Sequence, residues 1–302
     1  MTLLDPTLFT VSQVETWVWL PPLVAFTVSF FTSMGGISGA FILLPFQMSV
    51  LGYTAPSVSA TNQLFNIIAI PSGVYRYIKE KRMVWPLTWC VVIGTLPGVL
   101  IGAWIRIEYL TDPTTFKFFA GLVLGYIGLR LAKDFFKKPA DTPTGSPNLN
   151  SFTVSHSTFS LKQVTFTFDA TTYRFSTPGV FCLCAIVGII GGVYGIGGGA
   201  IIAPFLITFF GMPVYIIAGA TLMGTFITSV AGVIFYQLLA QFYPTVSVSP
   251  DYALGLLFGL GGFGGMYLGA KCQKYVPAHL IKLILCASIL FVAVKYIVGF
   301  LL

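Results

Sequence analysis

Charged side chains are too scarce in this chain to cover the surface of a soluble protein. Asp, Glu, Lys and Arg make up 8% of the 302 residues, whereas 56% are hydrophobic and 16% are aromatic. Soluble domains usually contain roughly 25% charged residues, because polar side chains must cover the surface that faces water. Most of this surface must therefore face a lipid bilayer, which excludes a soluble enzyme and a nucleic-acid-binding module.

The apolar residues form long runs separated by short polar breaks. A helix of about 20 apolar residues crosses a bilayer core of roughly 30 Å. The runs predict crossings over residues 56–78, 84–105, 114–136, 213–240, 252–271 and 278–301. Two further apolar segments, 17–51 and 179–210, are too long for one crossing and are interrupted by glycine-rich stretches. We expect each of these two segments to form a broken helix.

The two broken segments are similar to each other in sequence. A shift of 159 residues aligns Gly36–Gly39 with Gly195–Gly198 and Pro45 with Pro204. After an eight-residue insertion, the same alignment pairs Gly94, Gly98 and Gly102 with Gly261, Gly265 and Gly269. Internal repeats with glycine-rich interruptions at corresponding places are typical of transporters. The chain is therefore predicted to contain two transmembrane repeats.

The positions of the basic residues predict how the repeats are oriented. Cytoplasmic loops carry an excess of Lys and Arg. If each broken segment returns to the side from which it enters, 13 of the 16 basic residues lie on one side of the membrane and three on the other; ordinary crossings divide them 11 to 5. The three are Arg106, Lys117 and Lys295. The charges therefore favour an all-α polytopic membrane protein with two inverted repeats, each a broken, re-entrant helix hairpin plus three transmembrane helices.

This topology divides the chain into three parts. Residues 17–136 form the first transmembrane repeat and 179–302 the second, joined by a linker over 137–178. We expect the linker on the cytoplasmic side of the inner or plasma membrane and both termini outside. Within the linker, residues 152–155 and 164–168 alternate with period two, which predicts a small β-hairpin.

The glycine-rich motifs resemble those of a known family. The run Gly195–Ala200 followed by Pro204, and its copy between Gly36 and Pro45, are similar to the TauE/SafE family of sulfite-exporter-like permeases. The resemblance covers about residues 20–135 and 179–300 and implies transport of small sulfur-containing or organic anions, sulfite and sulfonates among them. The first copy departs from the pattern, because Ser38 and Ala40 replace the glycines of the second copy. The two half-sites should therefore differ chemically.

The breaks themselves can bind an anion. The N-terminus of a helix carries unpaired N–H groups and roughly half a positive charge, and glycine lets an anion approach the backbone. With no charge expected to be buried, the site must consist of such N-termini and neutral polar groups. The alternative is that the glycines only allow close helix packing, which we expect for the aligned glycines of 94–102 and 261–269.

Neutral polar residues near the breaks complete the predicted site. Asn62 and Asn66 align with Thr221 and Thr225, and each pair has the i, i+4 spacing of one helix face. Hydrogen bonding between helices is the alternative role for these side chains. The predicted substrate-binding residues are Ser33, Gly35, Gly36, Ser38, Gly39, Gln47, Asn62, Asn66, Tyr194, Gly197, Gly198, Gly199, Thr221 and Thr225.

The absence of catalytic, metal-binding and ATP-binding motifs from the sequence also bears on function. The two histidines, His156 and His279, belong to no recognisable catalytic set, and no metal-ligand spacing or ATP-binding motif occurs. We expect no enzyme activity, no catalytic residues, no metal and no cofactor. Because Asp and Glu all fall in tails, loops or helix ends, we expect no intramembrane proton relay.

These observations predict potential-assisted export of a small anion by alternating access. Two alternatives stay open: a proton- or ion-coupled uptake permease, and a non-transporting membrane scaffold that acts through the 137–178 loop. The sequence does not decide between a monomer and a homodimer.

Overall fold

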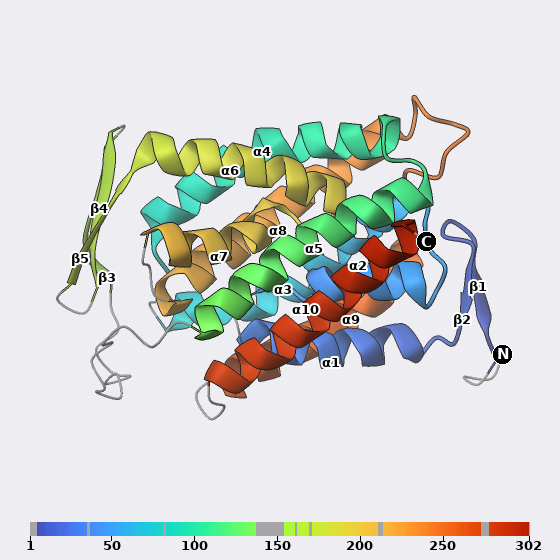
Figure 1. Cartoon of the computed structure of the whole chain (residues 1–302), viewed down its shortest axis with the longest axis horizontal. Helices are drawn as coiled ribbons and strands as arrows, with labels where there is room; N and C mark the ends of the chain where they lie inside the picture. The colour runs from blue at the N-terminus through green and yellow to red at the C-terminus, as the bar shows by residue number, and fades with distance from the viewer. Residues whose placement is uncertain are drawn as a thin grey trace.

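The computed structural model describes residues 5–34, 37–80, 83–136, 154–160, 162–168, 171–210, 214–272 and 278–301. In these residues the chain forms a mostly helical bundle with a small sheet at each end (Figure 1). The helices are α1 (Leu20–Met34), α2 (Ala40–Ser49), α3 (Ser57–Lys79), α4 (Trp85–Glu108), α5 (Pro113–Phe136), α6 (Thr177–Tyr194), α7 (Gly198–Phe210), α8 (Val214–Leu239), α9 (Tyr252–Cys272) and α10 (Ala278–Leu301). The strands are β1 (Thr7–Phe9), β2 (Val14–Thr16), β3 (Val154–Phe159), β4 (Gln163–Phe168) and β5 (Thr171–Ser176).

The helices coincide with the predicted apolar segments to within a few residues. Four stretches of the described chain are long and apolar enough to cross a membrane: Trp85–Glu108, Thr177–Tyr194, Ile217–Leu239 and Tyr252–Cys272. Helix α3 has a similar length, 23 residues, but a more polar sequence. The polar side chains of Asn62, Gln63 and Asn66 on this helix are fully buried inside the protein, so they do not contact lipid.

Hydrogen bonds between distant loops define one end of the bundle. The Ser12 N–H donates to the Asp251 carboxylate at 3.1 Å, and the Ser57 N–H donates to the Ser247 carbonyl at 2.9 Å. The starts of α3 and α9 therefore lie beside the β1–β2 sheet, and we call this the β1–β2 end. Both chain termini lie toward it (Figure 1). The opposite end carries strands β3 to β5, and we call it the β3–β5 end.

The linker forms more sheet than the sequence indicated. The predicted two-stranded hairpin is a three-stranded antiparallel sheet in the order β3-β4-β5. Strand β5 pairs Thr171 with Phe168 and Ser176 with Gln163. In its sequence Tyr173 and Phe175 alternate with Thr172, Arg174 and Ser176, and such aromatic residues suit a pleated strand. Helix α6 consequently begins at Thr177, where Ser176 caps it by accepting a hydrogen bond from the Gly179 N–H at 3.4 Å.

Each broken segment forms two helices that return to the end where they started. Helix α1 starts at the β1–β2 end and α2 leads back to it, whereas α6 starts at the β3–β5 end and α7 leads back there (Figure 1). At 1.5 Å per residue, α1 spans about 22 Å and α6 about 27 Å. The first helix of each pair is therefore longer than half a bilayer crossing, and α6 is long enough to cross by itself.

The two breaks share one hydrogen bond and differ in backbone conformation. The Ile37 N–H donates to the Thr32 carbonyl at 3.2 Å, and the aligned Ile196 N–H donates to the Gly191 carbonyl at 3.1 Å. In the second break, Gly195 and Gly197 have φ values of 75° and 74°, which only glycine adopts without strain. Ser38, which aligns with Gly197, does not have a positive φ.

Aligned glycines bring helices of different segments into close contact. A Cβ at five of these glycines would overlap the backbone of α1 or α6, and a Cβ at Gly94 would overlap the Cys184 side chain of α6. The contacts join Pro22 to Gly261, Phe26 to Gly265 and Phe30 to Gly269, and they join Ala185 to Gly98 and Ile189 to Gly102. Close packing is thus confirmed as the role of these glycines.

Candidate functional site

The two helix breaks meet at one buried amide, that of Asn66 on α3. The Ser38 hydroxyl, in the first break, donates to Asn66 Oδ1. Asn66 Nδ2 donates to the Ile196 carbonyl of the second break at 3.1 Å and to Ser229 Oγ of α8 at 3.3 Å. Asn66 is fully buried. A single side chain therefore joins both breaks to the contact between α3 and α8.

Asn62 lies one helical turn from Asn66 and holds α2 in place. Its Nδ2 donates to the Ala40 carbonyl at 3.1 Å, and its Oδ1 accepts a hydrogen bond from Gln47 Nε2 at 3.3 Å. The polar face predicted for α3 therefore contacts the break and the body of α2, and it brings Ser38, Gln47, Asn62 and Asn66 together.

The N-terminus of α2 lies beside the buried Ser29 hydroxyl of α1. Gly39 caps the helix without a side chain, and the Ala40 N–H donates to Ser38 Oγ at 3.3 Å. A Cβ at Gly39 would lie 2.7 Å from Ser29 Oγ of α1. Ser29 is fully buried, and its hydroxyl has no hydrogen-bond partner within the described chain. The helix N-terminus and this hydroxyl together favour a negatively charged ligand.

The N-terminus of α7 is packed much more tightly. The Gly198 N–H donates to Thr228 Oγ1 at 3.3 Å, and a Cβ at this glycine would overlap Thr95 of α4. A Cβ at Gly199 would overlap the α8 backbone at Thr221, and one at Gly197 would lie 3.1 Å from Ser229 Oγ. The glycines at this break are therefore required by packing, and the two half-sites differ in their surroundings.

The other predicted site residues take up several positions. The hydroxyls of Thr221 and Thr225 are buried beside α7 but donate back to α8 carbonyls, at 3.2 and 2.9 Å. The Tyr194 hydroxyl donates to the Phe41 carbonyl at 3.2 Å and thereby links α6 to α2. Ser33 lies in the α1–α9 contact beside Gly269 and donates to the Phe30 carbonyl at 3.3 Å, so it is not directed at the break. Gly35 and Gly36 lie outside the described residues.

Comparison with known proteins identifies the family. The model of the sulfite exporter TauE/SafE family matches residues 22–296. The chain belongs to the sulfite exporter TauE/SafE family. It is 25% identical over 275 residues to a Bacillus subtilis (strain 168) protein described as probable membrane transporter protein YunE, with 87% of this chain and 90% of that protein covered. No solved structure matches this chain. The resemblance seen in the glycine motifs is thus confirmed, and the protein is a multi-pass membrane transporter rather than an enzyme.

The positive charge of Arg106 is buried in this TauE/SafE protein, contrary to the expectation from its sequence. Arg106, near the end of α4, is fully buried. Its guanidinium donates to the Leu110 carbonyl and, at 3.1 Å, to the Thr54 carbonyl, and it lies 3.7 Å from the centre of the Phe116 ring. The predicted crossing ended at residue 105, but α4 continues to Glu108. Because of this extra turn, Arg106 lies inside the protein instead of in a loop.

The loop between α2 and α3 is fixed by a second buried contact of this transporter. The Tyr53 and Thr61 hydroxyls form a hydrogen bond of 2.9 Å, and Thr61 Oγ1 also accepts the Asp251 N–H at 2.8 Å. Burial raises the pKa of Tyr53 above its ordinary value, so the phenol stays protonated. The two loops that flank α2 and α9 are therefore held together at the β1–β2 end.

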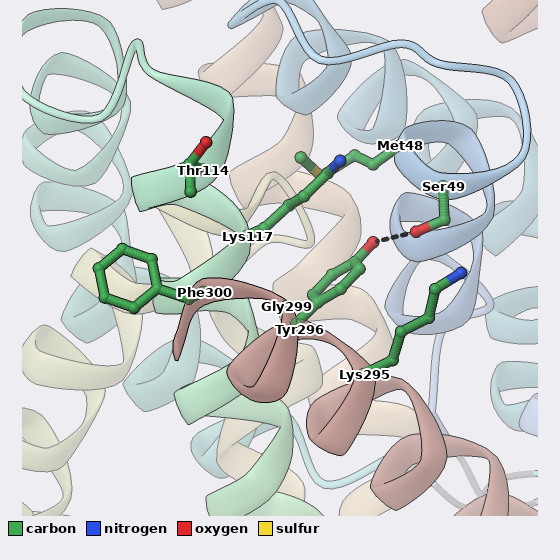
Figure 2. A pocket seen from close by; sticks show the side chains of 8 residues that line it. All are labelled: Met48, Ser49, Thr114, Lys117, Lys295, Tyr296, Gly299 and Phe300. Atoms are coloured by element: carbon green, nitrogen blue, oxygen red, sulfur yellow. Dashed lines mark hydrogen bonds between the residues drawn. The ribbon is translucent and has the colours of Figure 1, made fainter. Parts of the chain in front are cut away.

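A basic hollow of the transporter lies between the end of α2, the start of α5 and the end of α10 (Figure 2), toward the β1–β2 end (Figure 1). It encloses about 290 Å³ and is lined by Met48, Ser49, Thr114, Lys117, Lys295, Tyr296, Gly299 and Phe300. The Ser49 hydroxyl donates to the Tyr296 oxygen at 3.0 Å, and the Tyr296 hydroxyl donates to the Pro45 carbonyl at 3.3 Å. The lining contains two lysines and no acidic residue, a composition that attracts anions. None of the predicted substrate-binding residues lines this hollow.

Proposed function

We propose that this TauE/SafE transporter exports small sulfur-containing or organic anions of the sulfite and sulfonate class. The observation that carries the proposal is the convergence of both helix breaks on the Asn66 amide. Beside it, the N-terminus of α2 and the Ser29 hydroxyl provide a positive dipole and a donor without a carboxylate. Neutral donors and a helix N-terminus bind an oxyanion yet let it dissociate, as transport requires.

The transport cycle that we propose is alternating access by two inverted repeats. In support, the two hairpins open toward opposite ends of the bundle (Figure 1). Helix α1 of the first half packs on the glycines of α9, and α6 of the second half packs on the aligned glycines of α4. Each hairpin thus contacts a helix of the other half. Rocking of the halves around the breaks would expose the site to each side in turn.

The membrane potential is the driving force in this proposal. An inside-negative potential supplies roughly 2.3 kcal/mol per charge per 100 mV for an anion that leaves the cell. In the described part of the chain, the acidic residue that is buried is Asp251, and it caps α9 at the β1–β2 end by accepting the Leu254 N–H at 3.0 Å. The site therefore has no carboxylate beside it that could relay a proton.

The proposed orientation follows from the basic residues. The β3–β5 end, with the linker, faces the cytoplasm, and the β1–β2 end, with both termini, faces outside the inner or plasma membrane. Lys117 and Lys295 would then line the outer mouth of the export path, where the hollow has room for a small anion. A cysteine introduced at Ser160, which is exposed at the β3–β5 end, should react with an impermeant reagent only after the cells are opened.

Reconstitution tests the proposal directly. Purified protein in proteoliposomes would receive sulfite, sulfate, thiosulfate, a sulfonate or a small carboxylate under an imposed potassium diffusion potential. We expect sulfur oxyanions to move toward the positive side without a proton gradient. Accumulation that strictly requires a proton or sodium gradient would instead identify a coupled uptake permease. If no anion moves, the remaining hypothesis is a non-transporting scaffold that acts through residues 137–178.

A further inference from the structure

The amide of Gln63 is buried without hydrogen bonds at the contact between α3 and α8. Gln63 is 0% exposed, and neither its Nε2 nor its Oε1 has a hydrogen-bond partner in the described residues. The amide lies against Gly232 of α8, where a Cβ would overlap the Gln63 carboxamide. Gly232 therefore provides the space that the amide occupies.

An unpartnered amide is costly at this position. Each buried donor or acceptor without a hydrogen bond destabilises a protein by about 1–3 kcal/mol, and the interior of a membrane protein offers no bulk water as a substitute. Buried groups of this kind in a native structure usually indicate a ligand, an ordered water or a functional role. The amide of Gln63 therefore calls for an explanation other than stability.

The second half of the chain builds the same contact without an amide. The shift of 159 residues aligns Gln63 with Leu222 and Gly232 with Gly73. Leu222 packs on Gly73, with its Cδ1 at 3.7 Å from the position of a Cβ there. The packing of a long side chain against a glycine is thus satisfied by leucine in one half and by glutamine in the other. The fold itself does not require an amide here.

Gln63 also lies close to the centre of the candidate site. It precedes Asn66 by three residues on α3, so the two side chains are neighbours on one helix face. Across the contact, Gly232 follows Ser229 by three residues, and Ser229 accepts a hydrogen bond from Asn66. The Gln63 amide is therefore one turn from the amide that joins the breaks, displaced toward the β1–β2 end.

We propose that Gln63 is a substrate-binding residue whose Nε2 donates a hydrogen bond to the transported anion. This inference rests on the proposed export function and adds a donor between Asn66 and the β1–β2 end. An anion that moves outward from the breaks passes this amide. A neutral donor holds the anion by hydrogen bonding yet adds no positive charge that would trap it.

The decisive variant is Gln63→Leu, which introduces the residue type found at the aligned position, Leu222. Removing an unpartnered amide should leave the melting temperature of the substrate-free protein unchanged or higher. Losing one hydrogen bond to an anion should lower sulfite affinity and uptake into proteoliposomes about tenfold or more. The Gln63→Met variant, which is close to glutamine in shape, should behave in the same way. Leu222→Met is the matched control and should transport like the unmodified protein.

The possible outcomes separate this inference from the proposed function. If the unmodified protein moves none of the anions, the export proposal fails and the role of Gln63 fails with it. If the unmodified protein is active and both Gln63 variants are equally active, only the role of Gln63 is wrong. If both variants lose stability together with transport, the amide is structural and the inference is overturned.

Discussion

At the residue scale, the buried polar groups of α3 determine where the two breaks lie. Asn66 bonds to both breaks and to α8, whereas Asn62 bonds to α2. A membrane protein can bury such amides only when other protein groups or a ligand satisfy them. The same residues therefore connect helices to one another and are also candidates for substrate binding.

Replacing Asn66 with aspartate should strongly reduce transport. Asn66→Asp keeps the shape of the side chain but adds a negative charge beside the anion site, and we expect at least a tenfold loss of sulfite movement in proteoliposomes. The Ser72→Ala variant on the same helix should retain activity, since the Ser72 hydroxyl donates to the Ala69 carbonyl of its own helix at 2.8 Å. Full activity of Asn66→Asp would show that the anion does not approach this amide.

Arg106 should contribute to stability through its two carbonyl contacts. Lysine keeps the positive charge but lacks the planar fork of the guanidinium, so Arg106→Lys should leave the Thr54 carbonyl or the Leu110 carbonyl unpaired. The cost of one such group is about 1–3 kcal/mol. We expect a lower midpoint of thermal unfolding in detergent, while an unchanged midpoint would mean that lysine reaches both carbonyls.

At the element scale, glycines let the two hairpins approach the helices of the other half. The α1–α9 and α4–α6 contacts both use glycines four residues apart, which allow the backbones to come close. The N-terminus of α7 depends on glycine for the same reason, whereas the α2 N-terminus has a free hydroxyl beside it. The two similar sequence motifs therefore produce one packed and one more polar half-site.

Two adjacent glycines of α9 offer a matched test of this packing. A Cβ at Gly265 would overlap the Phe26 carbonyl, but a Cβ at Gly264 would lie 3.4 Å from the Phe26 ring, an ordinary contact. Gly265→Ala should destabilise the protein by about 1–3 kcal/mol, and Gly264→Ala should have little effect. Thermal unfolding of the two variants measures the difference. Equal melting temperatures would contradict the close α1–α9 contact.

At the scale of the whole molecule, the hydrogen-bonded loops and the basic hollow distinguish the two ends. The sequence assigns Arg106, Lys117 and Lys295 to the side with few basic residues, and two of these three line the hollow at the β1–β2 end. The β1–β2 end has few basic residues, and two of them lie together in the hollow. This arrangement suits the release of an anion in the export that we propose.

Removing these two charges should change the response to anions on the outer side. In the Lys117→Gln, Lys295→Gln double variant, we expect external sulfite to inhibit export several-fold less than in the unmodified protein. The difference should shrink as ionic strength rises, because salt screens exposed charges. The Lys271→Gln variant is the control, because Lys271 lies in the last turn of α9, at the end of the bundle opposite the hollow. Equal inhibition of all three proteins would exclude the hollow from the export path.

The helices were predictable because membrane insertion imposes a length and a composition on each apolar segment. A crossing must bury about 20 residues in lipid, so the boundaries of α5 and α8 to α10 follow closely from hydrophobicity. The glycine-rich motifs predicted both helix breaks and the family, since their spacing is local. The linker was predicted less well, because its third strand depends on pairing with β4, a contact that local sequence does not show.

Contacts between segments far apart in the chain were decided only by the tertiary structure. The sequence by itself determined a mostly helical membrane transporter with two glycine-rich breaks. It did not reveal that Arg106 is buried, that Ser29 lies beside the α2 N-terminus, or that the Gln63 amide has no hydrogen bond within the described chain. Each of these depends on which neighbours surround a side chain, and hydrophobicity along the chain carries no information about neighbours on other helices.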